Sequence, residues 1–319
     1  MKTWLSVIVP VHNGEHFLEA ALASAASECA ASEYGQGIEF LIYDSSDDDG
    51  ACHQIAERYS RLLPLRYLAS HDCKPWTAKT NRGVVAARGT HVAMLHQDDL
   101  WLPGHLAALR SSLDRAPTAA LSIAPSRFVD GRGNDIGQWK LPFNQGIRAG
   151  SALAEKLIVQ NTIAIPSPMI RRDAWLAVGG MDETLWYTAD WDIYLKLAFQ
   201  DDVDVRPEVT TSFRLHGSSL TMTGRHDGEA FARQHEIVLA RHLPALSSGS
   251  RIRQEPLARA SARLNCTLAS LSARDRADFP ALLRALWNVG PARLRQLVRE
   301  TRIIDRVLPR LRLNLAGEL

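Results

Sequence analysis

Short apolar, β-branched runs alternate with amphipathic helical segments through the first 115 residues. Buried strands are predicted at four such runs, residues 5–10, 38–43, 65–68 and 91–95. Apolar residues at helical spacing predict helices between and after them, over residues 15–31, 51–62, 77–88 and 103–115. Alternation of this kind builds βαβ units with right-handed crossovers, so we expect an α/β fold with a mainly parallel central sheet.

Polar residues follow three of these strands at the point where each strand ends. They are His-Asn-Gly at 12–14, Asp-Ser-Ser-Asp at 44–47 and His-Gln-Asp-Asp at 96–99. The carboxyl ends of parallel strands meet along one edge of a sheet, and open α/β sheets bind their ligands there. We therefore expect these three segments to form one functional site.

The alternation becomes less regular after residue 128. Residues 129–150 are rich in Gly, Asn and Asp and predict a long loop or loose hairpin, the kind of segment that often covers a binding site. A helix over 191–199 follows Asp190, and a strand over 209–215 is predicted to end at His216.

Charge divides the chain into two parts. The formal net charge of the 319 residues is +2, but residues 217–319 contain 17 Arg, no Lys and 9 Asp and Glu, which gives +8. We predict an α/β domain over residues 1–217 and a helical, arginine-rich C-terminal region over 218–319. Apolar and arginine residues interleave at helical spacing in this region, which fits peripheral contact with an anionic membrane, packing on the α/β domain, or homo-oligomerisation.

Composition excludes several classes of protein. Hydrophobic residues make up 46% of the chain, which is typical of a globular protein and not of a disordered one. The four cysteines lack the spacing of a zinc site or a disulfide framework, and no apolar run is long enough to span a membrane. The basic region is too sparse for nucleic acid. We expect a cytoplasmic protein without a nucleic-acid partner, located at the inner face of the membrane if the basic region contacts lipid.

Seven motifs occur in an order that resembles the family 2 glycosyltransferases of the GT-A fold. The resemblance covers roughly residues 3–217, and its motifs are SVIVPVHNG, LIYDSSDDDG, NRG, MLHQDDLWLP, VGGMDE, ADWDIYLKL and FRLH. It implies transfer of a sugar, with inversion, from a nucleotide diphosphate sugar that is UDP- or GDP-linked. The implied acceptor is a hydroxyl of a glycan or lipid-linked molecule in polysaccharide or glycolipid assembly.

The resemblance also implies roles for particular residues. Asp98, Asp99 and His216 would bind a divalent metal, Mn²⁺ or Mg²⁺, and Asp190 would be the general base. The nucleotide would be bound by the remaining residues, Pro10, His12, Asn13, Asp44 and Asn81, together with Asp98. The chemistry suits these roles, because a cation bridging two phosphates stabilises the leaving group and an acceptor hydroxyl needs a base as it attacks.

Four positions depart from the common family pattern, namely Ser45, Thr80, His96 and Ala189. Lys79, beside Thr80, is the neighbouring candidate for a phosphate contact.

Structural roles compete with these assignments. The Asp98–Asp99 pair could cap the helix near Pro103, and Asp190 could cap its own helix. Asn13 could be an N-cap, and Asp44 with its acidic neighbours could form an Asx turn.

Two other functions also fit the pattern. A sugar-phosphate nucleotidyltransferase can share the α/β core, although the segment at 12–15 lacks the glycines expected of a triphosphate-binding loop. A non-catalytic binder of nucleotide sugars or glycans would explain the four departures.

Overall fold

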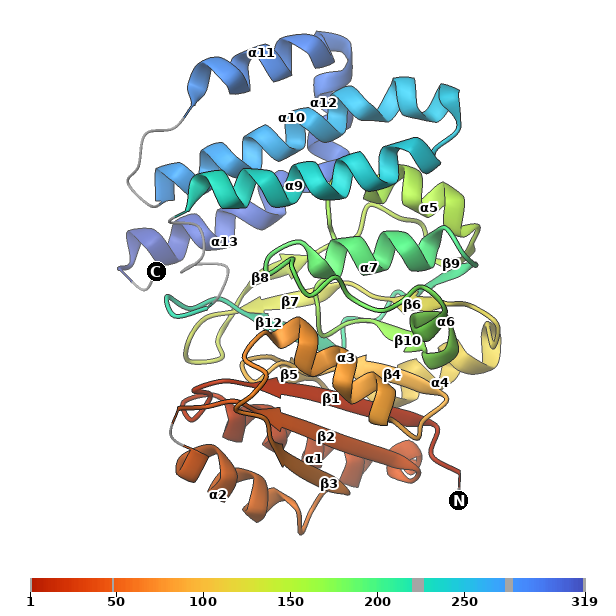
Figure 1. Ribbon diagram of the computed structural model, residues 1–319, viewed down its shortest axis with the longest axis vertical. Coiled ribbons are helices and arrows are strands. Elements are labelled where there is room, and N and C mark those ends of the chain that lie inside the picture. Colours follow the sequence, from red (N-terminus) through yellow and green to blue (C-terminus); the bar gives the residue numbers. More distant parts are fainter. Residues whose placement is uncertain (1, 48, 220–226, 273–277, 318–319) are drawn as a thin grey trace.

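The central sheet places β1 between two parallel neighbours. The structure, a computed structural model, describes residues 2–47, 49–219, 227–272 and 278–317 (Figure 1). Within them, eight strands form this sheet in the order β3-β2-β1-β4-β10-β6-β11-β9. β1 is parallel to β2 and β4, and β2 is parallel to β3. The strands are β1 (Leu5–Val11), β2 (Ile38–Asp44), β3 (Leu65–Ala69), β4 (His91–Met94), β6 (Leu121–Ile123), β9 (Gly146–Arg148), β10 (Met169–Arg171) and β11 (Val203–Val205).

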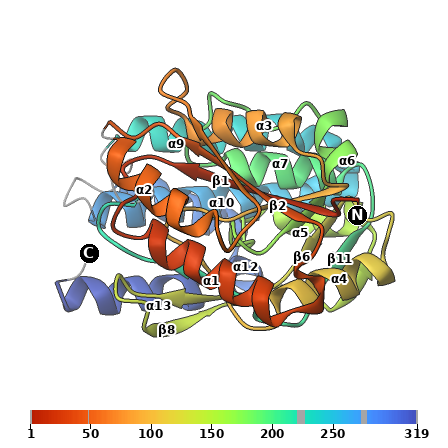
Figure 2. The same cartoon turned by 90° about the horizontal axis from the view of Figure 1, so that it is seen from below.

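Helices cover both faces of the β1–β4 part of the sheet. Figure 2 shows α1 and α2 on one side of β1 and β2, and α3 on the other. A Cβ atom at Gly83 of α3 would come within 2.5 Å of Ile8 Cγ2, so glycine lets this helix lie close to β1. Val7 and Val9 belong to the hydrophobic cluster that α1 completes with Leu18 and Leu22. The helices are α1 (Leu18–Ala31), α2 (Asp49–Tyr59), α3 (Trp76–Ala86) and α4 (His105–Arg115).

The predicted alternation of strands and helices up to residue 115 is confirmed, and the polar segments after β1, β2 and β4 share one sheet edge. A second sheet, in the order β5-β12-β7-β8, was not predicted. Residues 129–150 form more than a loop, because β8 pairs with β7 as a hairpin and β9 joins the edge of the central sheet. The strands are β5 (Leu100–Trp101), β7 (Ser126–Val129), β8 (Asp135–Trp139) and β12 (Thr211–Arg214).

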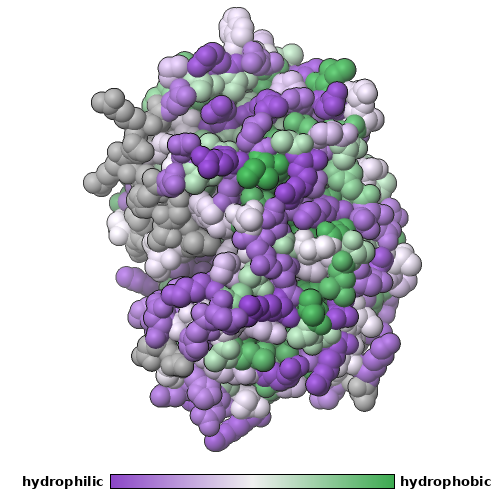
Figure 3. Space-filling view, in the orientation of Figure 1, coloured by the Kyte–Doolittle hydropathy of each residue, from purple (hydrophilic) through white to green (hydrophobic). Residues whose placement is uncertain are grey.

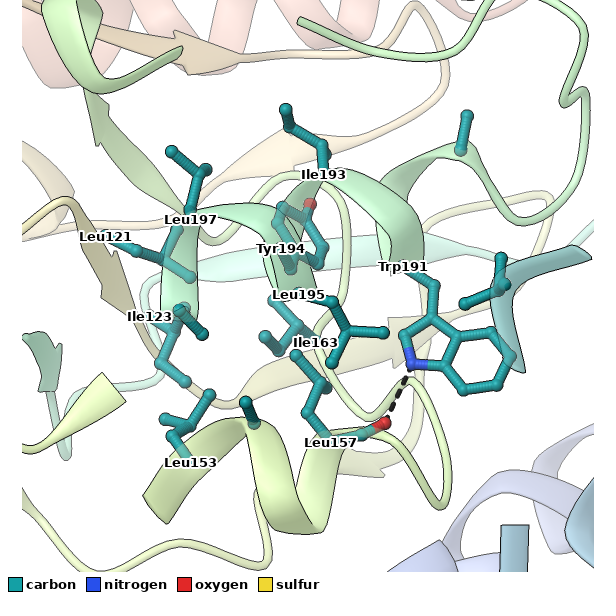
Figure 4. Close-up of a cluster of buried hydrophobic side chains, with 14 of the residues drawn as sticks. Leu121, Ile123, Leu153, Leu157, Ile163, Trp191, Ile193, Tyr194, Leu195 and Leu197 are labelled. Atoms are coloured by element: carbon teal, nitrogen blue, oxygen red, sulfur yellow. Dashed lines mark hydrogen bonds between the residues drawn. The ribbon is translucent and has the colours of Figure 1, made fainter. Parts of the chain in front are cut away.

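A second hydrophobic cluster anchors the helix that begins at Asp190 and its neighbours. Leu195 and Leu197 of α7 pack with residues of β6 and α5, as Figure 4 shows. Trp191 Nε1 donates a hydrogen bond to the carbonyl oxygen of Leu157 at 2.7 Å (Figure 4). The start of α7 is therefore fixed by both apolar and polar contacts. These helices are α5 (Gly150–Leu157), α6 (Arg172–Ala177) and α7 (Ala189–Ala198).

The C-terminal helices gather at the end of the molecule opposite α2 (Figure 1). α9 packs on α10 and α7, and α13 packs on β8. Packing on the α/β domain is thus present, whereas membrane contact and oligomerisation stay predictions, as does the boundary at residue 217. None of the described helices is both long and apolar enough to cross a membrane. The helices are α9 (Gly228–His242), α10 (Ser248–Ser272), α11 (Phe279–Val289), α12 (Pro291–Thr301) and α13 (Ile303–Leu315).

The surface around these helices is mixed in character. Figure 3 shows a mostly hydrophilic face on which hydrophobic residues form small, separate groups. On α11, three apolar side chains at every fourth position are exposed, namely Phe279, Leu283 and Trp287. The exposed fraction of Trp287 is 86%.

A buried carboxylate joins α7 to the C-terminal region. Asp192 is fully buried, and its Oδ1 accepts hydrogen bonds from Arg241 Nη1 at 2.7 Å and His242 Nε2 at 2.8 Å. Its Oδ2 lies 2.8 Å from Lys196 Nζ. Burial acts to raise the pKa of Asp192, but the hydrogen bonds from His242 and Lys196 outweigh it and lower the pKa to about 2.

We predict that Asp192→Ala lowers the free energy of unfolding by about 3 kcal/mol, because it removes a buried carboxylate that accepts several hydrogen bonds and leaves the buried His242 ring without this partner. Since the folded-state pKa is depressed, this contribution is present above about pH 4 and is lost as the pH falls towards 2. Denaturant unfolding at pH 7 and pH 3 measures both effects. The control Glu229→Ala removes an exposed ion pair with Arg233 and should cost less than about 1 kcal/mol. Equal losses for the two variants would contradict the prediction.

Candidate active site

A cavity of about 650 Å³ lies at the carboxyl ends of β1 and β4. Six of the nine residues that were predicted to bind the metal or nucleotide or to act as the base line it, although they are distant along the chain. They are Pro10, His12, Asp98, Asp99, Asp190 and His216. Trp139, Trp186 and Phe213 add aromatic surface to the same wall. These six residues therefore lie around one cavity.

Asp98 and His216 contact each other directly. His216 Nε2 lies 2.8 Å from Asp98 Oδ2, and His216 Nδ1 lies 2.9 Å from Ser218 Oγ. Arg214 Nε donates to the carbonyl oxygen of Asp98 at 2.7 Å, which ties β12 to the loop after β4. Burial acts to raise the pKa of Asp98, but the hydrogen bond from His216 opposes it, and this pKa lies below its ordinary value.

Asp99 is buried beside this pair. Its Oδ1 accepts a hydrogen bond from the backbone N–H of Arg214 at 3.1 Å, and its Oδ2 has no partner among the described residues. Burial and the neighbouring Asp98 carboxylate raise the pKa of Asp99 well above its ordinary value. Neither aspartate caps α4, whose N-cap is Gly104, so the capping interpretation of the Asp98–Asp99 pair is wrong.

The chemistry of this group suits a divalent cation in part. Asp98 offers a carboxylate and His216 an imidazole, and Mn²⁺ accepts both as ligands. The Oδ2 of Asp99 is a further buried oxygen, and it has no hydrogen-bond partner among the described residues. No three His, Cys, Asp or Glu side chains meet in metal-binding geometry in the described part of the chain. The residues therefore supply two adjacent donor groups and a third carboxylate nearby, which leaves coordination positions for phosphate oxygens or water.

Asp190 lies at the start of α7 and faces the same cavity. Its Oδ2 accepts a hydrogen bond from Asn161 Nδ2 at 2.7 Å, and its Oδ1 accepts from the backbone N–H of Trp191 at 2.8 Å. The N-cap of α7 is Thr188, so Asp190 does not cap the helix, although it accepts an N–H in the first turn. Burial raises the pKa of Asp190 to about 7, against the hydrogen bonds from Trp191 and Asn161 that lower it.

Tyr187 and Tyr194 are the titratable neighbours of Asp190. Burial raises the pKa of both phenols, so they are neutral at pH 7. The hydroxyl of Tyr194 has no hydrogen-bond partner within the described ranges.

The loop after β1 is held against the ends of β2 and β4. Gln97 clasps His12, accepting from its backbone N–H at 2.8 Å and donating to its carbonyl oxygen at 3.1 Å. His12 Nδ1 lies 2.9 Å from the carbonyl oxygen of Ser45. Asn13 has a left-handed φ of 48° and bonds to Ser46 and Asp47, so it joins the loops and is not the N-cap of α1, which is Phe17.

Three predicted nucleotide contacts, Asn13, Asp44 and Asn81, do not line the cavity. Asp44 is fully buried, and its carboxylate accepts from the Ser46 N–H at 2.8 Å and from the Tyr67 hydroxyl at 2.8 Å. The first of these bonds is the Asx turn considered for this segment. Asp47 is exposed and pairs with Lys74 at 3.0 Å. A contact between Asp44 and a nucleotide base stays a prediction.

Asn81 holds the loop that precedes α7. Its Oδ1 accepts from the backbone N–H of Met181 at 2.9 Å, and its Nδ2 donates to the Met181 carbonyl oxygen and to Glu183 Oε1, each at 2.9 Å. A Cβ atom at Gly180, which has a φ of +73°, would come within 2.6 Å of Asn81 Oδ1. This amide therefore positions the loop, and its contact with a nucleotide stays a prediction.

Two positions at which the chain departs from the family pattern, Ser45 and His96, are contacted by neighbouring side chains. Lys79 is buried and donates to the Val11 carbonyl oxygen at 2.6 Å and to Ser45 Oγ at 2.8 Å. Burial lowers the pKa of Lys79 to about 8. His96 packs edge-on against Trp76, and burial lowers its pKa to about 4, so its imidazole is neutral at pH 7.

Four residues of the cavity or its supports were not predicted, namely Gln160, Asn161, Arg306 and Arg310. The first two sit in an irregular segment between α5 and β10, and the arginines lie on α13, about a hundred residues beyond the last recognised motif. The two arginines were counted only as part of the basic region, because no local pattern separates a guanidinium in a cavity from one in solvent.

Comparison with known proteins agrees with this geometry. The profile described as "Glycosyl transferase family 2" matches residues 6–174, more than half of the chain. An uncharacterized glycosyltransferase of Rickettsia conorii is 25% identical over 203 residues, which cover 61% of this chain and 31% of the relative. Chondroitin synthase of Escherichia coli is 22% identical over 194 residues, 61% of this chain and 26% of the relative. The chain thus spans about a third or less of the length of these two relatives.

Solved structures show the same fold. S. aureus TarS in complex with UDP-GlcNAc superposes with a TM-score of 0.66 and 17% identity, covering 96% of this chain and 88% of that one. The mannosyltransferase PcManGT of Pyrobaculum calidifontis, in complex with GDP-Man and Mn²⁺, gives 0.55 and 16%, covering 100% and 89%. These similarities show that the chain has the GT-A fold, and the family match shows that it belongs to glycosyl transferase family 2.

Proposed function

We propose that this enzyme transfers a sugar, with inversion, from a UDP- or GDP-linked sugar to a hydroxyl of a glycan or lipid-linked acceptor. The observation that carries the proposal is the single cavity in which the Asp98–His216 pair and the Asp190 carboxylate both lie. The Asp98–His216 pair suits the binding of a cation and a diphosphate, and the Asp190 carboxylate suits the role of proton acceptor. Complexes of UDP-GlcNAc and GDP-Man with the two similar structures support a donor of this class.

The donor side of the cavity is built from the ends of β1 and β4. Asp98 and His216 would hold Mn²⁺ or Mg²⁺, which when bound would neutralise the diphosphate leaving group. Pro10 and His12 line the cavity where the nucleotide would lie, and the Gln97 clasp fixes the position of His12. Arg214 bonds to the Asp98 carbonyl oxygen and to the Asp99 carboxylate, and His216 contacts the Asp98 carboxylate, so both carboxylates are oriented before any ligand binds.

The acceptor side is built around Asp190. A direct displacement at the anomeric carbon needs a base on the face opposite the leaving group, and one such displacement inverts the configuration. Asn161 and the Trp191 N–H fix the Asp190 carboxylate, and its pKa of about 7 lets it accept a proton near neutral pH. The proton of the acceptor hydroxyl passes to this carboxylate as the oxygen attacks.

Release of nucleoside diphosphate from a panel of sugar nucleotides, with Mn²⁺ or Mg²⁺ and a mixture of glycan acceptors, tests the proposal. Turnover of at least one donor supports it, and a folded protein that turns over none contradicts it. Release of pyrophosphate from nucleoside triphosphate and sugar phosphate would indicate a nucleotidyltransferase. Donor binding without any turnover would indicate a non-catalytic binder.

We predict that Asp190→Asn lowers kcat by about 10² to 10⁴-fold, because the amide cannot accept the proton. The affinity for nucleoside diphosphate, measured by calorimetry, should stay within a factor of about two, since the donor side is unchanged. Asp202→Asn changes an exposed carboxylate beyond the end of α7 and is the matched control. Full activity of the Asp190 variant would remove this residue from the proposed role.

We predict that kcat/KM rises with pH through an apparent pKa near 7 and then levels off, because Asp190 acts only when deprotonated. Asn161→Ala removes a hydrogen bond that favours the charged carboxylate, so the rise should move to higher pH. Steady-state rates between pH 5 and pH 9 measure both. A profile that does not move in this variant would argue against Asp190 as the titrating group.

We predict that nucleoside diphosphate binds at least about tenfold more tightly with Mn²⁺ than without it, and that His216→Ala or Asp98→Asn abolishes this difference. Calorimetric titration of UDP and GDP with Mn²⁺ and after chelation measures the effect. His16→Ala removes an exposed imidazole in the loop between β1 and α1, and this variant should keep the difference in affinity with and without Mn²⁺. If the two site variants respond to Mn²⁺ as the wild type does, these residues do not hold the cation.

A further inference from the structure

Exposed apolar side chains concentrate on the last three helices. Of the fourteen large hydrophobic side chains that are exposed among the described residues, nine lie within residues 279–315. On α11 they form a single row, the apolar row, because Phe279, Leu283 and Trp287 follow one another at intervals of four residues, about 40° apart around the helix. Another side of α11 packs on the protein through residues such as Leu286. The apolar row therefore faces solvent along the length of α11.

Arginines lie beside these apolar side chains. An exposed apolar residue is directly followed by an exposed arginine four times on α11, α12 and α13, at Leu283–Arg284, Leu294–Arg295, Val298–Arg299 and Leu311–Arg312. None of these four arginines takes part in an ion pair within the described residues, whereas Arg302 pairs with Asp305 at 2.6 Å. The other carboxylate of the three helices, Glu300, is buried, and Asp278 before α11 serves as its N-cap. The outer surface of these helices is thus both apolar and positively charged.

A groove beside α11 adds further guanidinium groups. It has a volume of about 550 Å³, lies between α10 and α11 (Figure 1), and is lined by Arg259, Arg263 and Arg284 with one carboxylate, Glu255. Glu255 and Glu236 both pair with Arg259, each at 2.9 Å. Arg263 and Arg284 have no ion pair with any residue that the structure describes. These two guanidinium groups can therefore bind an anion from outside the protein, because their N–H groups match the oxygens of a phosphate.

The groove borders the apolar row. Arg284 follows Leu283 by one position and so lies about 100° further around α11, on the side of the groove. Asn288 has the same relation to Trp287 and also lines the groove. Tryptophan is enriched where lipid meets water, because its ring is apolar and its N–H is polar. A row of aromatic and aliphatic side chains beside arginines is typical of a helix that lies on an anionic membrane.

We propose that α11 and the adjoining groove dock this protein on an anionic lipid membrane. The apolar row enters the boundary between headgroups and acyl chains, and Arg263 and Arg284 bind lipid phosphates. A second copy of the chain is a poorer occupant of this face, because it would bring its own arginines against these. The inference goes beyond the proposed function and does not depend on it, since no described residue of α11 lines the cavity that holds Asp190.

Flotation of the full chain with lipid vesicles tests the proposal. Vesicles of phosphatidylcholine alone are compared with vesicles of an equal mixture of phosphatidylcholine and phosphatidylglycerol. We expect the anionic vesicles to bind the protein about tenfold or more tightly, and this preference to fall with added salt, which screens the attraction between arginine and phosphate. Equal binding to both kinds of vesicle, or no binding to the anionic ones, would overturn the proposal.

Substitutions separate the apolar part of the face from the charged part. Trp287→Ser should weaken binding to the anionic vesicles by about tenfold, because the indole no longer enters the lipid. The double variant Arg263→Gln/Arg284→Gln should weaken it by about tenfold or more through loss of the phosphate contacts. Leu62→Ser and Arg61→Gln are the matched controls, because both residues are exposed just after α2, at the other end of the molecule (Figure 1). Both controls should bind vesicles as the wild type does.

The remaining outcomes assign the face to its occupant. Unchanged vesicle binding in both the Trp287 variant and the arginine variant would overturn the inference. A dimer in analytical ultracentrifugation that Trp287→Ser abolishes, in a chain that binds no vesicles, would mean that a second copy covers this face. Turnover of a sugar nucleotide with a water-soluble acceptor should be unchanged in these variants. Loss of vesicle binding therefore leaves the proposed function standing, and absence of turnover leaves the docking face standing.

Discussion

Parallel pairing of β1 with both β2 and β4 is the constraint on which the rest of the site depends. The register fixes Val11 opposite Asp44 and Ile8 opposite Met94, so the three polar loops must emerge at one edge. The loops are then locked together by the Gln97 clasp on His12 and by bonds from Asn13 to the loop after β2. The helices α1 and α3 hold the strands from opposite faces, and the cavity forms where the loops end.

Hydrogen bonds connect Asp190 to the C-terminal region. Asp190 is fixed by Asn161, and the segment that carries Asn161 is held through Gln160 by Ser261 and Asn265 of α10. Two residues further along α7, Asp192 ties the same helix to α9. Helices beyond the family match thus help to hold this carboxylate, and α13 adds Arg306 and Arg310 to the lining of the same cavity. Loss of this region would disturb the base as well as the acceptor wall.

The sequence was sufficient to predict the parts of the fold that follow from local periodicity. β1 to β4 and the helices between them have a clear hydrophobic periodicity, and His12, Asp98 and Asp99 follow directly after strands that this periodicity predicts. The second sheet was missed because its strands are two to five residues long and pair across up to 112 positions, as Ser212 does with Leu100. Arg306 and Asn161 could not be assigned either, because their roles come from tertiary contacts that no spacing encodes. Asn81 and Asp44 are the opposite case. Each lies in a family motif and could be singled out from the sequence, but its hydrogen bonds in the structure hold neighbouring loops and strands.

We propose that Asp98 and His216 share one divalent cation with the donor diphosphate, with Asp190 in the same cavity. Crystals of the full chain grown with UDP or GDP and Mn²⁺ allow the cation to be located by its anomalous scattering. The account predicts a single strong peak in contact with Asp98, His216 and the diphosphate oxygens. A bound nucleotide whose Mn²⁺ peak lies away from both side chains would contradict it.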